Sequence, residues 1–410
     1  MQKAEIRAVA GVAGKAVARP TKVAREVHQA VTRRVFGALG PLSAPVRVMH
    51  DPLSAGSYRA VGAALRAPLW TAGLLASTTA AETSSSLAES RVGALALGAA
   101  NGIVGDRLAR SHPELAVGFS LRYDGRDLSL SRAALTAAYP EATPRVAVFI
   151  HGLCETEHAW TSPFPGSAPR RTYGQRLQAQ AGITPLHLRY NTGLHVSDNG
   201  RALAAMLEQL TGAWPTKLDS IALVGHSMGG LVARSACHYA EREGLECVPR
   251  VTHVICLGTP HLGAPLEKAA NVLGWPFARL PETRPFAELF VNGRSAGIKD
   301  LRFGSCVEDD WCDCDPDEFL RDRCCEVPFL DSTSYYFVAA TLSRRPHGMG
   351  GLVGDLLVTH RSASGTGRRR RIPFEPEHGT HVGRIDHLRL LNHPVIYEQL
   401  KAWLADDRQV

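Results

Sequence analysis

The chain has 410 residues, of which 45% are hydrophobic and 21% are charged, a composition typical of a globular protein and not of a disordered or collagen-like one. It carries 46 Lys plus Arg against 39 Asp plus Glu, for a formal net charge of +7. Residues 1–50 hold nine of the basic side chains and two acidic ones, so this segment alone accounts for the +7 and the rest of the chain is neutral. A nucleic-acid-binding body is therefore not expected.

The first 50 residues have the pattern of a basic helical arm. Residues 2–18 and 21–37 show the apolar spacing of amphipathic helices, and a break between them is expected at Arg19-Pro20. Basic helices of this kind attract anionic head groups, so residues 1–47 are a candidate for peripheral contact with an anionic membrane. The alternative is a pair of ordinary helices that pack on residues 51–110 and leave a basic face in water.

No apolar run reaches the roughly 18–20 residues that a membrane-spanning helix needs. The N-terminus lacks the apolar stretch of a secretory signal, and nine cysteines, an odd number, favour a reducing compartment. We therefore expect a cytoplasmic protein, with peripheral membrane contact as an option. Residues 51–112 are expected to form a further, nearly neutral helical extension.

From residue 113 onward the pattern changes to short strands that alternate with helices. A hairpin is expected at Asp124-Gly125, and the repeated strand–helix units after it predict an α/β domain with a mostly parallel sheet and helices on both faces. About 75 residues without a clean strand follow Pro260 and predict a lid or cap insertion at about 262–333. The expected strands are 116–122, 127–130, 146–150, 185–190, 221–224, 251–257 and 335–341, and the expected helices are 172–181, 199–211, 228–241 and 395–404.

Two Gly-x-Ser-x-Gly motifs occur, one around Ser227 and one around Ser295. A nucleophilic serine of this kind lies on a sharp turn between a strand and a helix, with small neighbours that let the backbones approach. Ser227 follows a buried strand and opens a helix, whereas Ser295 has no strand before it and no helix pattern after it. Ser227 is therefore the candidate nucleophile, and Ser295 is expected to be a loop serine.

The oxyanion hole of such an enzyme needs main-chain N–H groups aimed at the attacked carbonyl oxygen. Met228, the residue after the candidate nucleophile, supplies one candidate N–H. The second is expected from Leu153, in the loop after strand 146–150, where Gly152 permits the turn. The neighbouring His151 is expected to be a packed structural residue.

The acid and the histidine of the triad are expected after the serine in the chain. Asp355 is the first carboxylate after the last expected strand, and its apolar neighbours suit a buried acid that orients an imidazole. A surface aspartate in a glycine turn is the alternative. His387 is the preferred base, with His393 second because it precedes Pro394 and suits a helix cap. The other histidines in this region, expected to be solvated, are His360, His378 and His381.

Taken together, the motifs resemble the lipase and esterase branch of the α/β-hydrolase superfamily over about residues 113–410. The residues that carry the resemblance are His151-Gly152-Leu153, the Gly-His-Ser-Met-Gly of 225–229, the Gly-Thr-Pro-His-Leu-Gly-Ala-Pro of 258–265, Gly354-Asp355, and residues 386–394. The resemblance implies an α/β-hydrolase fold in which Ser227, Asp355 and His387 form the catalytic triad. It specifies no substrate, and it does not extend to residues 1–112.

The favoured function is a serine carboxylic-ester hydrolase that cleaves an ester of an apolar acyl group through an acyl-enzyme. Trp275, Phe277 and Phe286 in the cap are candidate substrate-binding side chains, with plain helix packing as the alternative. No metal or organic cofactor is required. Two other functions stay open: acyl transfer or thioester hydrolysis with the same triad, and a non-catalytic membrane-associated scaffold on a hydrolase fold.

Residues 304–329 combine five cysteines with a run of seven acidic residues between positions 308 and 318. The cysteine spacing fits a structural zinc site poorly, and the Asp313-x-Asp315-x-Asp317 pattern lacks the glycine and the final carboxylate of a calcium loop. Disulfides are a third option. A solvated acidic cap segment with incidental thiols is the preferred interpretation.

Overall fold

The structure of the chain, a computed structural model, describes residues 1–79, 86–162, 171–265, 267–269, 281, 285, 293–315, 318, 321–346 and 353–405. It divides into two compact units. The first comprises residues 1–90, 108–115 and 269–294, and the second comprises residues 91–107, 116–268 and 295–410. The boundaries expected from the sequence, at residues 50 and 112, differ from this division, because residues 91–107 fall in the unit that contains the sheet.

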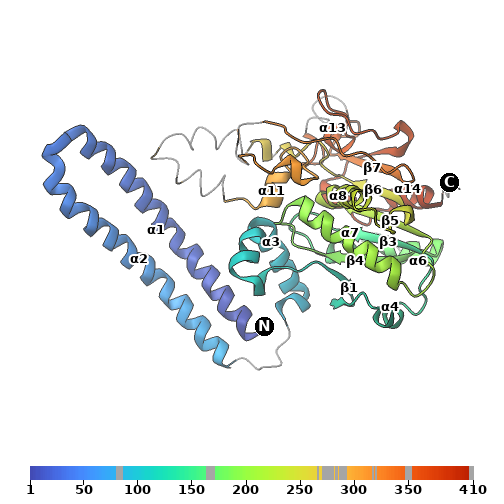
Figure 1. Cartoon of the computed structure of the whole chain (residues 1–410), viewed down its shortest axis with the longest axis horizontal. Coiled ribbons are helices and arrows are strands. Elements are labelled where there is room, and N and C mark those ends of the chain that lie inside the picture. The colour runs from blue at the N-terminus through green and yellow to red at the C-terminus, as the bar shows by residue number, and fades with distance from the viewer. Residues whose placement is uncertain are drawn as a thin grey trace. The chain divides into compact units, whose positions relative to one another are not determined.

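Two long helices, α1 (Lys3–Leu39) and α2 (Ala44–Thr79), form most of the first unit and pack along each other (Figure 1). The short 3₁₀ turn η1 (Gly40–Ser43) joins them. The expected break at Arg19-Pro20 is wrong, since Pro20 lies inside α1. Proline removes one helical hydrogen bond, and packing against α2 outweighs this local preference.

The second unit contains one eight-stranded sheet in the order β2-β1-β4-β3-β5-β6-β7-β8. Strand β1 is antiparallel to both β2 and β4, and all other neighbouring strands are parallel, which confirms the predicted mostly parallel sheet. The strands are β1 (Ser120–Tyr123), β2 (Arg126–Leu128), β3 (Arg145–Ile150), β4 (Thr184–Arg189), β5 (Ser220–His226), β6 (Val251–Leu257), β7 (Ser334–Thr341) and β8 (Gly379–Gly383).

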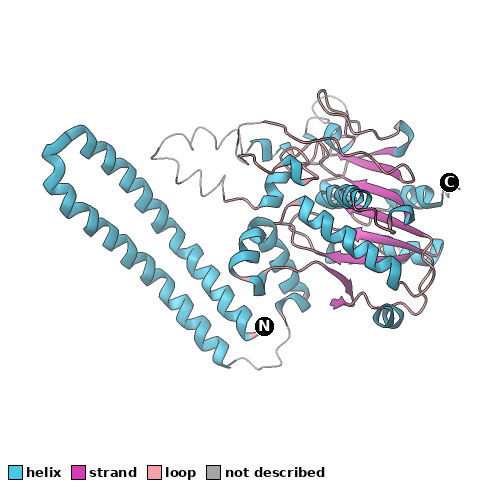
Figure 2. Cartoon of the chain, in the orientation of Figure 1, coloured by secondary structure: helices cyan, strands magenta, loops and turns pink. Residues whose placement is uncertain are grey.

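Helices cover both faces of this sheet (Figure 2). Successive residues of a strand point to opposite faces, so each strand contributes to two separate cores. On one face Val148 and Leu223 pack with helices α7 (Val196–Ala213) and α8 (Met228–Arg242). On the other face Phe149 and Val224 pack with helices α6 (Tyr173–Ala181) and α14 (Pro394–Ala405). The predicted helices on both faces are therefore confirmed.

Strand β8, which pairs with β7 at the edge of the sheet, is not expected from the sequence. Its residues are all half-buried, and their Gly-Thr-His-Val-Gly sequence lacks the apolar run that identified the other strands. Two histidines expected to be solvated are consequently packed instead. His378 is buried with its Nδ1 3.2 Å from the Tyr335 carbonyl oxygen, and His381 is half-buried with its Nε2 2.8 Å from Thr341 Oγ1.

Shorter helices complete the described part of the chain. Helix α3 (Arg91–Ser111) runs across the division between the units and is interrupted at Val104, whose φ of −138° is not helical. None of the helices in the described residues combines the length and the apolar character that crossing a bilayer requires. The remaining elements are α4 (Arg132–Ala138), α5 (His158–Thr161), α11 (Ala296–Asp300), α13 (His360–Ala363), η2 (Leu87–Glu89), η3 (Pro113–Leu115), η4 (Val248–Arg250), η5 (Glu308–Asp310), η6 (Pro376–His378) and η7 (His387–Leu390).

Candidate active site

Ser227 lies on the sharp turn between β5 and α8, as the sequence predicts. Its φ of 52° and ψ of −121° are strained for a residue that carries a side chain. Its N–H donates a hydrogen bond to the carbonyl oxygen of Leu257 at 2.8 Å, which holds the turn against the end of β6. A Cβ on Gly229 would lie 2.3 Å from the carbonyl oxygen of Ile150, so only glycine lets α8 begin this close to β3.

Ser295, in the second Gly-x-Ser-x-Gly motif, has a different setting. It is the N-cap of the short helix α11, a helix that the sequence analysis did not expect. The Ser295 hydroxyl donates to the Gly102 carbonyl oxygen at 2.6 Å and accepts from the Ile298 N–H at 3.3 Å. The side chain is fully buried, so its hydroxyl has a capping role and faces no cavity among those described below.

Asp355 and His387, the predicted acid and base, lie in contact. The distance between His387 Nδ1 and Asp355 Oδ2 is 2.7 Å. The second carboxylate oxygen of Asp355 accepts hydrogen bonds from the N–H groups of Leu357 at 3.0 Å and Val358 at 2.8 Å. The carboxyl group is almost fully buried, and three donors fix it in place. The predicted pairing of these residues across 32 positions of sequence is therefore present in the fold.

The other ring nitrogen of His387, Nε2, is buried and has no hydrogen-bond partner in the described part of the chain. Ser227 and His387 both line a cavity of about 170 Å³. Gly258 lies against the imidazole, because a Cβ there would be 3.1 Å from His387 Cε1. The φ of Gly258 is +60°, so a glycine is needed there for backbone conformation as well as for space.

Leu153 and Met228, the predicted oxyanion donors, belong to elements that border the same cavity. Leu153 lines it directly, and Met228 is the first residue of α8, next to Ser227. Among the described residues, no hydrogen bond from the Leu153 N–H occurs, and the Met228 N–H makes none outside α8. The loop that carries Leu153 is supported from behind, since a Cβ on Gly102 of α3 would be 2.3 Å from Cys154 Sγ.

His151, at the start of this loop, is a packed structural residue, as expected. Its ring stacks on Tyr190 with the centroids 4.3 Å apart, and its Nε2 accepts from the Tyr190 N–H at 3.3 Å. Burial lowers the pKa of His151, which keeps the ring neutral at pH 7.

Two charged residues that the sequence analysis did not single out also line the cavity, Glu155 and His226. Glu155 Oε2 accepts from the Gly152 N–H at 2.7 Å and lies 3.0 Å from His226 Nδ1. Burial alone would raise the pKa of Glu155, but the adjacent His226 charge and hydrogen bond lower it to about 2. Burial likewise acts to lower the pKa of His226, and the Glu155 carboxylate more than offsets this and raises it. The only sequence signal was a glutamate four residues after His151, for which no motif rule exists.

Apolar side chains form much of the remaining wall of the cavity. They include Leu153, Ile298, Leu301, Leu357 and Leu388. The candidate substrate-binding residues of the cap, Trp275, Phe277 and Phe286, lie outside the residues that the structure describes.

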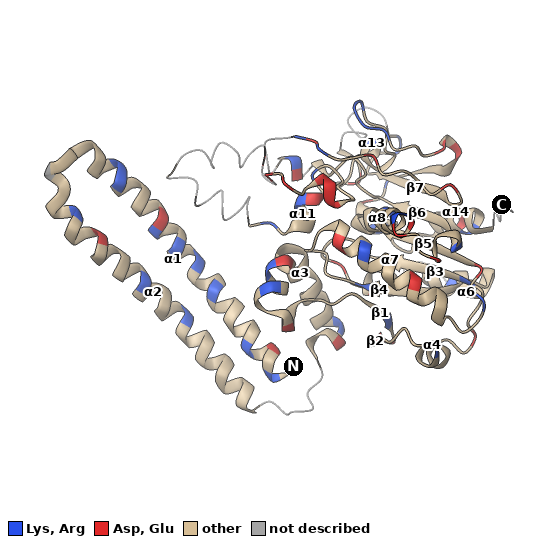
Figure 3. Cartoon of the chain, in the orientation of Figure 1, with Lys and Arg blue, Asp and Glu red and all other residues tan. Residues whose placement is uncertain are grey.

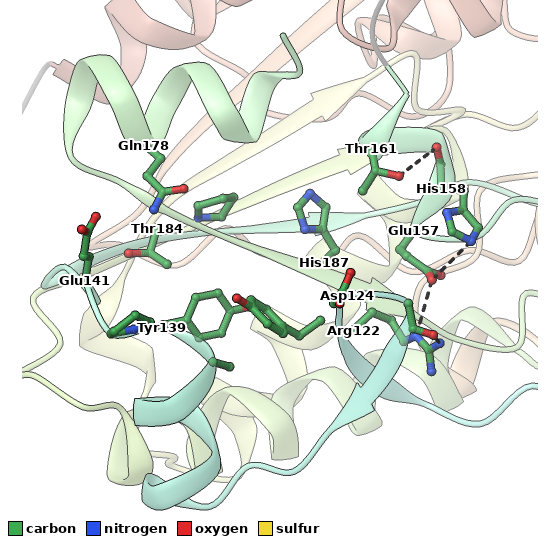
Figure 4. A pocket seen from close by; sticks show the side chains of 15 residues that line it. Arg122, Asp124, Tyr139, Glu141, Glu157, His158, Thr161, Gln178, Thr184 and His187 are labelled. Atoms are coloured by element: carbon green, nitrogen blue, oxygen red, sulfur yellow. Dashed lines mark hydrogen bonds and ion pairs between the residues drawn. The ribbon is translucent and has the colours of Figure 1, made fainter. Parts of the chain in front are cut away.

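A second and larger cavity, of about 580 Å³, lies beside β1 and β4 (Figure 4). Its polar wall includes Arg122 and Glu157, and Arg122 Nε lies 3.4 Å from Glu157 Oε1. Glu157 Oε2 also accepts a hydrogen bond at 2.6 Å from Nε of Arg189, which does not line the cavity. Burial lowers the pKa of His187 in the same wall to about 4, so this ring is neutral at pH 7. None of the sequence-predicted site residues lines this cavity.

The cysteine-rich segment is less solvated than expected. Asp310 is buried and accepts hydrogen bonds from the N–H groups of Cys306 at 2.7 Å and Cys325 at 2.6 Å, so one acid of the run is a structural anchor. All nine cysteines are free thiols. Within the described ranges, no three His, Cys, Asp or Glu side chains come together in a way that could hold a metal ion.

Comparisons with known proteins agree with this architecture. Residues 145–275, about a third of the chain, match the family described as a PGAP1-like alpha/beta domain. No curated protein matches the chain.

Similar solved structures include the mature Bacillus licheniformis lipase BlEst2, with 21% identity, 63% of this chain and 91% of that chain covered, and a TM-score of 0.41. The Pyrococcus furiosus esterase Pf2001 has 18% identity over 65% of this chain and 81% of its own, with a TM-score of 0.34. The metagenomic carboxyl esterase MGS0156 has 16% identity over 64% and 76%, with a TM-score of 0.37. Because these TM-scores are low, the fold assignment rests on the sheet order, the strand–serine–helix turn and the family match. The chain therefore has an α/β-hydrolase fold, in which residues 145–275 are similar to a PGAP1-like alpha/beta domain.

Proposed function

We propose that the chain is a serine carboxylic-ester hydrolase in which Ser227 is the nucleophile, His387 the general base and Asp355 the residue that orients the imidazole. One observation carries the proposal. His387 is held at Nδ1 by Asp355 at 2.7 Å, while its Nε2 is buried without a partner among the described residues at a cavity shared with Ser227. A base presented in this way can take the proton of the serine hydroxyl when a substrate closes the cavity.

The reaction follows from these positions. Ser227 Oγ attacks the ester carbonyl carbon as His387 Nε2 takes its proton, and the charge on the carbonyl oxygen is stabilised by the N–H groups of Leu153 and Met228. His387 then returns the proton to the departing alcohol oxygen as the carbon–oxygen bond breaks. Water then attacks the acyl-enzyme carbonyl with the same proton transfers through His387, which releases the carboxylic acid and restores Ser227. The Asp355 carboxylate stays ionised and stabilises the imidazolium formed in each half.

An apolar acyl group is the substrate part that the cavity suits. The leucine and isoleucine side chains in its wall offer no hydrogen bond to a polar acyl chain, and they exclude water from a bound apolar one. Trp275, Phe277 and Phe286 stay a proposal from the sequence alone, as side chains suited to an apolar acyl group. Acyl transfer and thioester hydrolysis would use the same residues and differ only in the acceptor or the leaving group.

The test is hydrolysis of p-nitrophenyl esters with acyl chains from short to long, with Ser227→Ala as the paired variant. We expect turnover that rises with chain length until the cavity is full, and no turnover above background for Ser227→Ala. Added alcohol or thiol acceptors show whether acyl transfer competes with water. Wild-type rates in Ser227→Ala would refute the assignment of the nucleophile, and an inactive wild type on every ester and thioester would favour the non-catalytic scaffold.

We also propose that α1 and α2 make the peripheral contact with an anionic membrane. Basic residues are spread along the length of α1, whereas α2 carries few charges (Figure 3). Large apolar side chains on α2 stay exposed, with relative exposures of 69% at Met49, 67% at Leu53, 61% at Trp70 and 67% at Leu75. Exposed apolar surface next to basic side chains matches the acyl chains and the anionic head groups of a lipid surface. The proposed contact thus extends beyond residues 1–47 to include α2.

A further inference from the structure

Glu155 and His226 connect three loops whose relative positions matter for the proposed reaction. Glu155 follows β3 in the loop that carries the Leu153 N–H, His226 is the last residue of β5 before Ser227, and His387 begins η7. The carboxylate of Glu155 accepts from the Gly152 N–H at 2.7 Å and lies 3.0 Å from His226 Nδ1. On the other side of the same ring, His226 Nε2 lies 3.2 Å from the carbonyl oxygen of His387.

The direction of these hydrogen bonds requires a charged imidazole. A carboxylate and a carbonyl oxygen both accept only, so a His226 ring that bonds to both must donate from both nitrogens. A ring with two N–H groups is the imidazolium form, and the negative charge beside it is supplied by Glu155. The ring is 1% exposed, so water does not replace either partner.

The following groups surround the pair formed by Glu155 and His226. The groups that face His226 are Glu155 from the loop after β3, and Asp355 and His387 from the loops after β7 and β8. The ring of Trp160 in α5 is nearly perpendicular to the His226 ring, with the centroids 6.3 Å apart. The neutral His151 lies beyond Glu155. A larger residue would crowd the middle of the contact, since a Cβ on Gly152 would be 3.0 Å from Ser227 Cβ and 3.2 Å from His226 Nδ1.

We propose that Glu155 and His226 are positioning residues, which set the Leu153 N–H, the Ser227 turn and the His387 loop at the spacing that the reaction needs. This inference rests on the proposed function, and it assigns to the pair no contact with the substrate's reacting atoms. The link acts on both sides of the ester carbonyl: through Gly152 on the oxyanion side, and through the His387 carbonyl on the base side.

Three variants separate positioning from simple stabilisation. Glu155→Ala removes the acceptor for both Gly152 and His226, and we expect kcat to fall about 100-fold with KM changed less than threefold, the size of effect that follows from a misplaced oxyanion donor. Glu155→Gln keeps an acceptor for the Gly152 N–H but loses the charge, so it should recover at least tenfold of that loss. Glu208→Gln is the control, because Glu208 accepts the Cys247 N–H at 2.9 Å on the other face of the sheet, and it should retain wild-type kcat.

The pH profile of kcat gives a readout that a purely structural pair would not move. In the wild type we expect an alkaline limb from loss of the second His226 proton, whose pKa the Glu155 carboxylate raises against the effect of burial. In Glu155→Gln the alkaline limb should shift by at least about one unit toward lower pH. In His226→Gln, which has no titrating ring, it should disappear.

Wild-type kcat and an unchanged pH profile in folded Glu155→Ala and His226→Gln would overturn the inference, even if their melting temperatures fall. The proposed function fails by a different result, namely ester hydrolysis that survives Ser227→Ala. A dead Ser227→Ala together with unaffected Glu155 and His226 variants would leave the triad standing and remove only the positioning role.

Discussion

The carboxylate of Asp355 and the imidazole of His387 lie 2.7 Å apart, and each is fixed by its own loop. The His387 N–H donates back to the Asp355 carbonyl oxygen at 3.1 Å, so the two residues are linked through main chain as well as side chain. An acceptor at Nδ1 places the ring proton there and leaves the free lone pair on Nε2. The contact therefore determines which nitrogen can act as a base.

Asp355→Asn should reduce kcat about 10³–10⁴-fold, because an amide that donates to Nδ1 would reverse the tautomer of His387. The shape of the residue is kept, so we expect the melting temperature to change little. Asp331→Asn, an exposed aspartate just before β7, serves as the control and should keep wild-type kcat. Less than tenfold loss in Asp355→Asn would show that this carboxylate does not set the tautomer.

Gly258→Ala should lower both activity and stability. The new methyl group would meet Leu390 Cδ1 at 2.5 Å and the His387 ring at 3.1 Å, and the φ of +60° strains any residue with a Cβ. We expect kcat to fall at least about tenfold, as misplaced catalytic groups do. Gly182→Ala is the matched control, with a φ of +61° and no atom within 4 Å of the new methyl group. It should cost about 1 kcal/mol of unfolding free energy and leave kcat unchanged, and equal activity in the two variants would contradict the packing argument.

Acid should destabilise the wild type more than Glu155→Gln. The pKa of Glu155 is lowered from 4.5 to about 2, so its ionised form stabilises the fold above pH 4.5 and this contribution is lost as the pH falls toward 2. The loss amounts to at most about 3 kcal/mol. Urea unfolding at several pH values between 7 and 2.5 measures it. Parallel stability curves for the two proteins would mean that the ion pair with His226 does not form.

Binding to anionic vesicles should depend on both helices of the first unit. Leu53→Ser combined with Trp70→Ala removes exposed apolar area of α2, and Arg19→Gln, Lys22→Gln and Arg33→Gln together remove charge from α1. At about 1 kcal/mol per basic side chain, the charge variant should bind about 100-fold more weakly, and high salt should weaken the wild type in the same way. Hydrolysis of a soluble ester is the control and should not change.

Co-sedimentation with phosphatidylserine-containing and purely zwitterionic vesicles measures this binding. Equal binding by the wild type and both variants would contradict a lipid contact. So would a stable dimer of the wild type that the α2 variant loses, because a second copy would then cover the apolar face.

The sequence predicts the parts of the fold whose local signals agree with tertiary structure. Strand 251–257 matches the structure residue for residue, because a buried parallel strand is a continuous apolar run. The prediction of a helix break at Pro20 was wrong and strand β8 was not predicted, for opposite reasons. Pro20 carries a strong local signal that helix packing overrides, and β8 carries almost none, since half-buried edge positions tolerate Gly, Thr and His.

The residues of the candidate site likewise divide into those that the local sequence predicts and those that it does not. Ser227, Asp355 and His387 could be selected because each needs a recognisable local context, and the structure brings Asp355 and His387 into contact. Glu155 and His226 could not be selected, because their relation exists only across the gap between two parallel strands. The support of the loop that carries Leu153 by Gly102 is likewise a contact between segments about 50 residues apart, which no short motif encodes.

The central claim, that Ser227 is the nucleophile, is tested most directly by fluorophosphonate labelling followed by intact mass and peptide mapping. Ser295→Ala provides the matched control, since it removes the serine of the other Gly-x-Ser-x-Gly motif. We predict one label on Ser227 in the wild type and in Ser295→Ala, and none in Ser227→Ala. Labelling of Ser227→Ala at the wild-type rate, or a label mapped to another serine, would contradict the account.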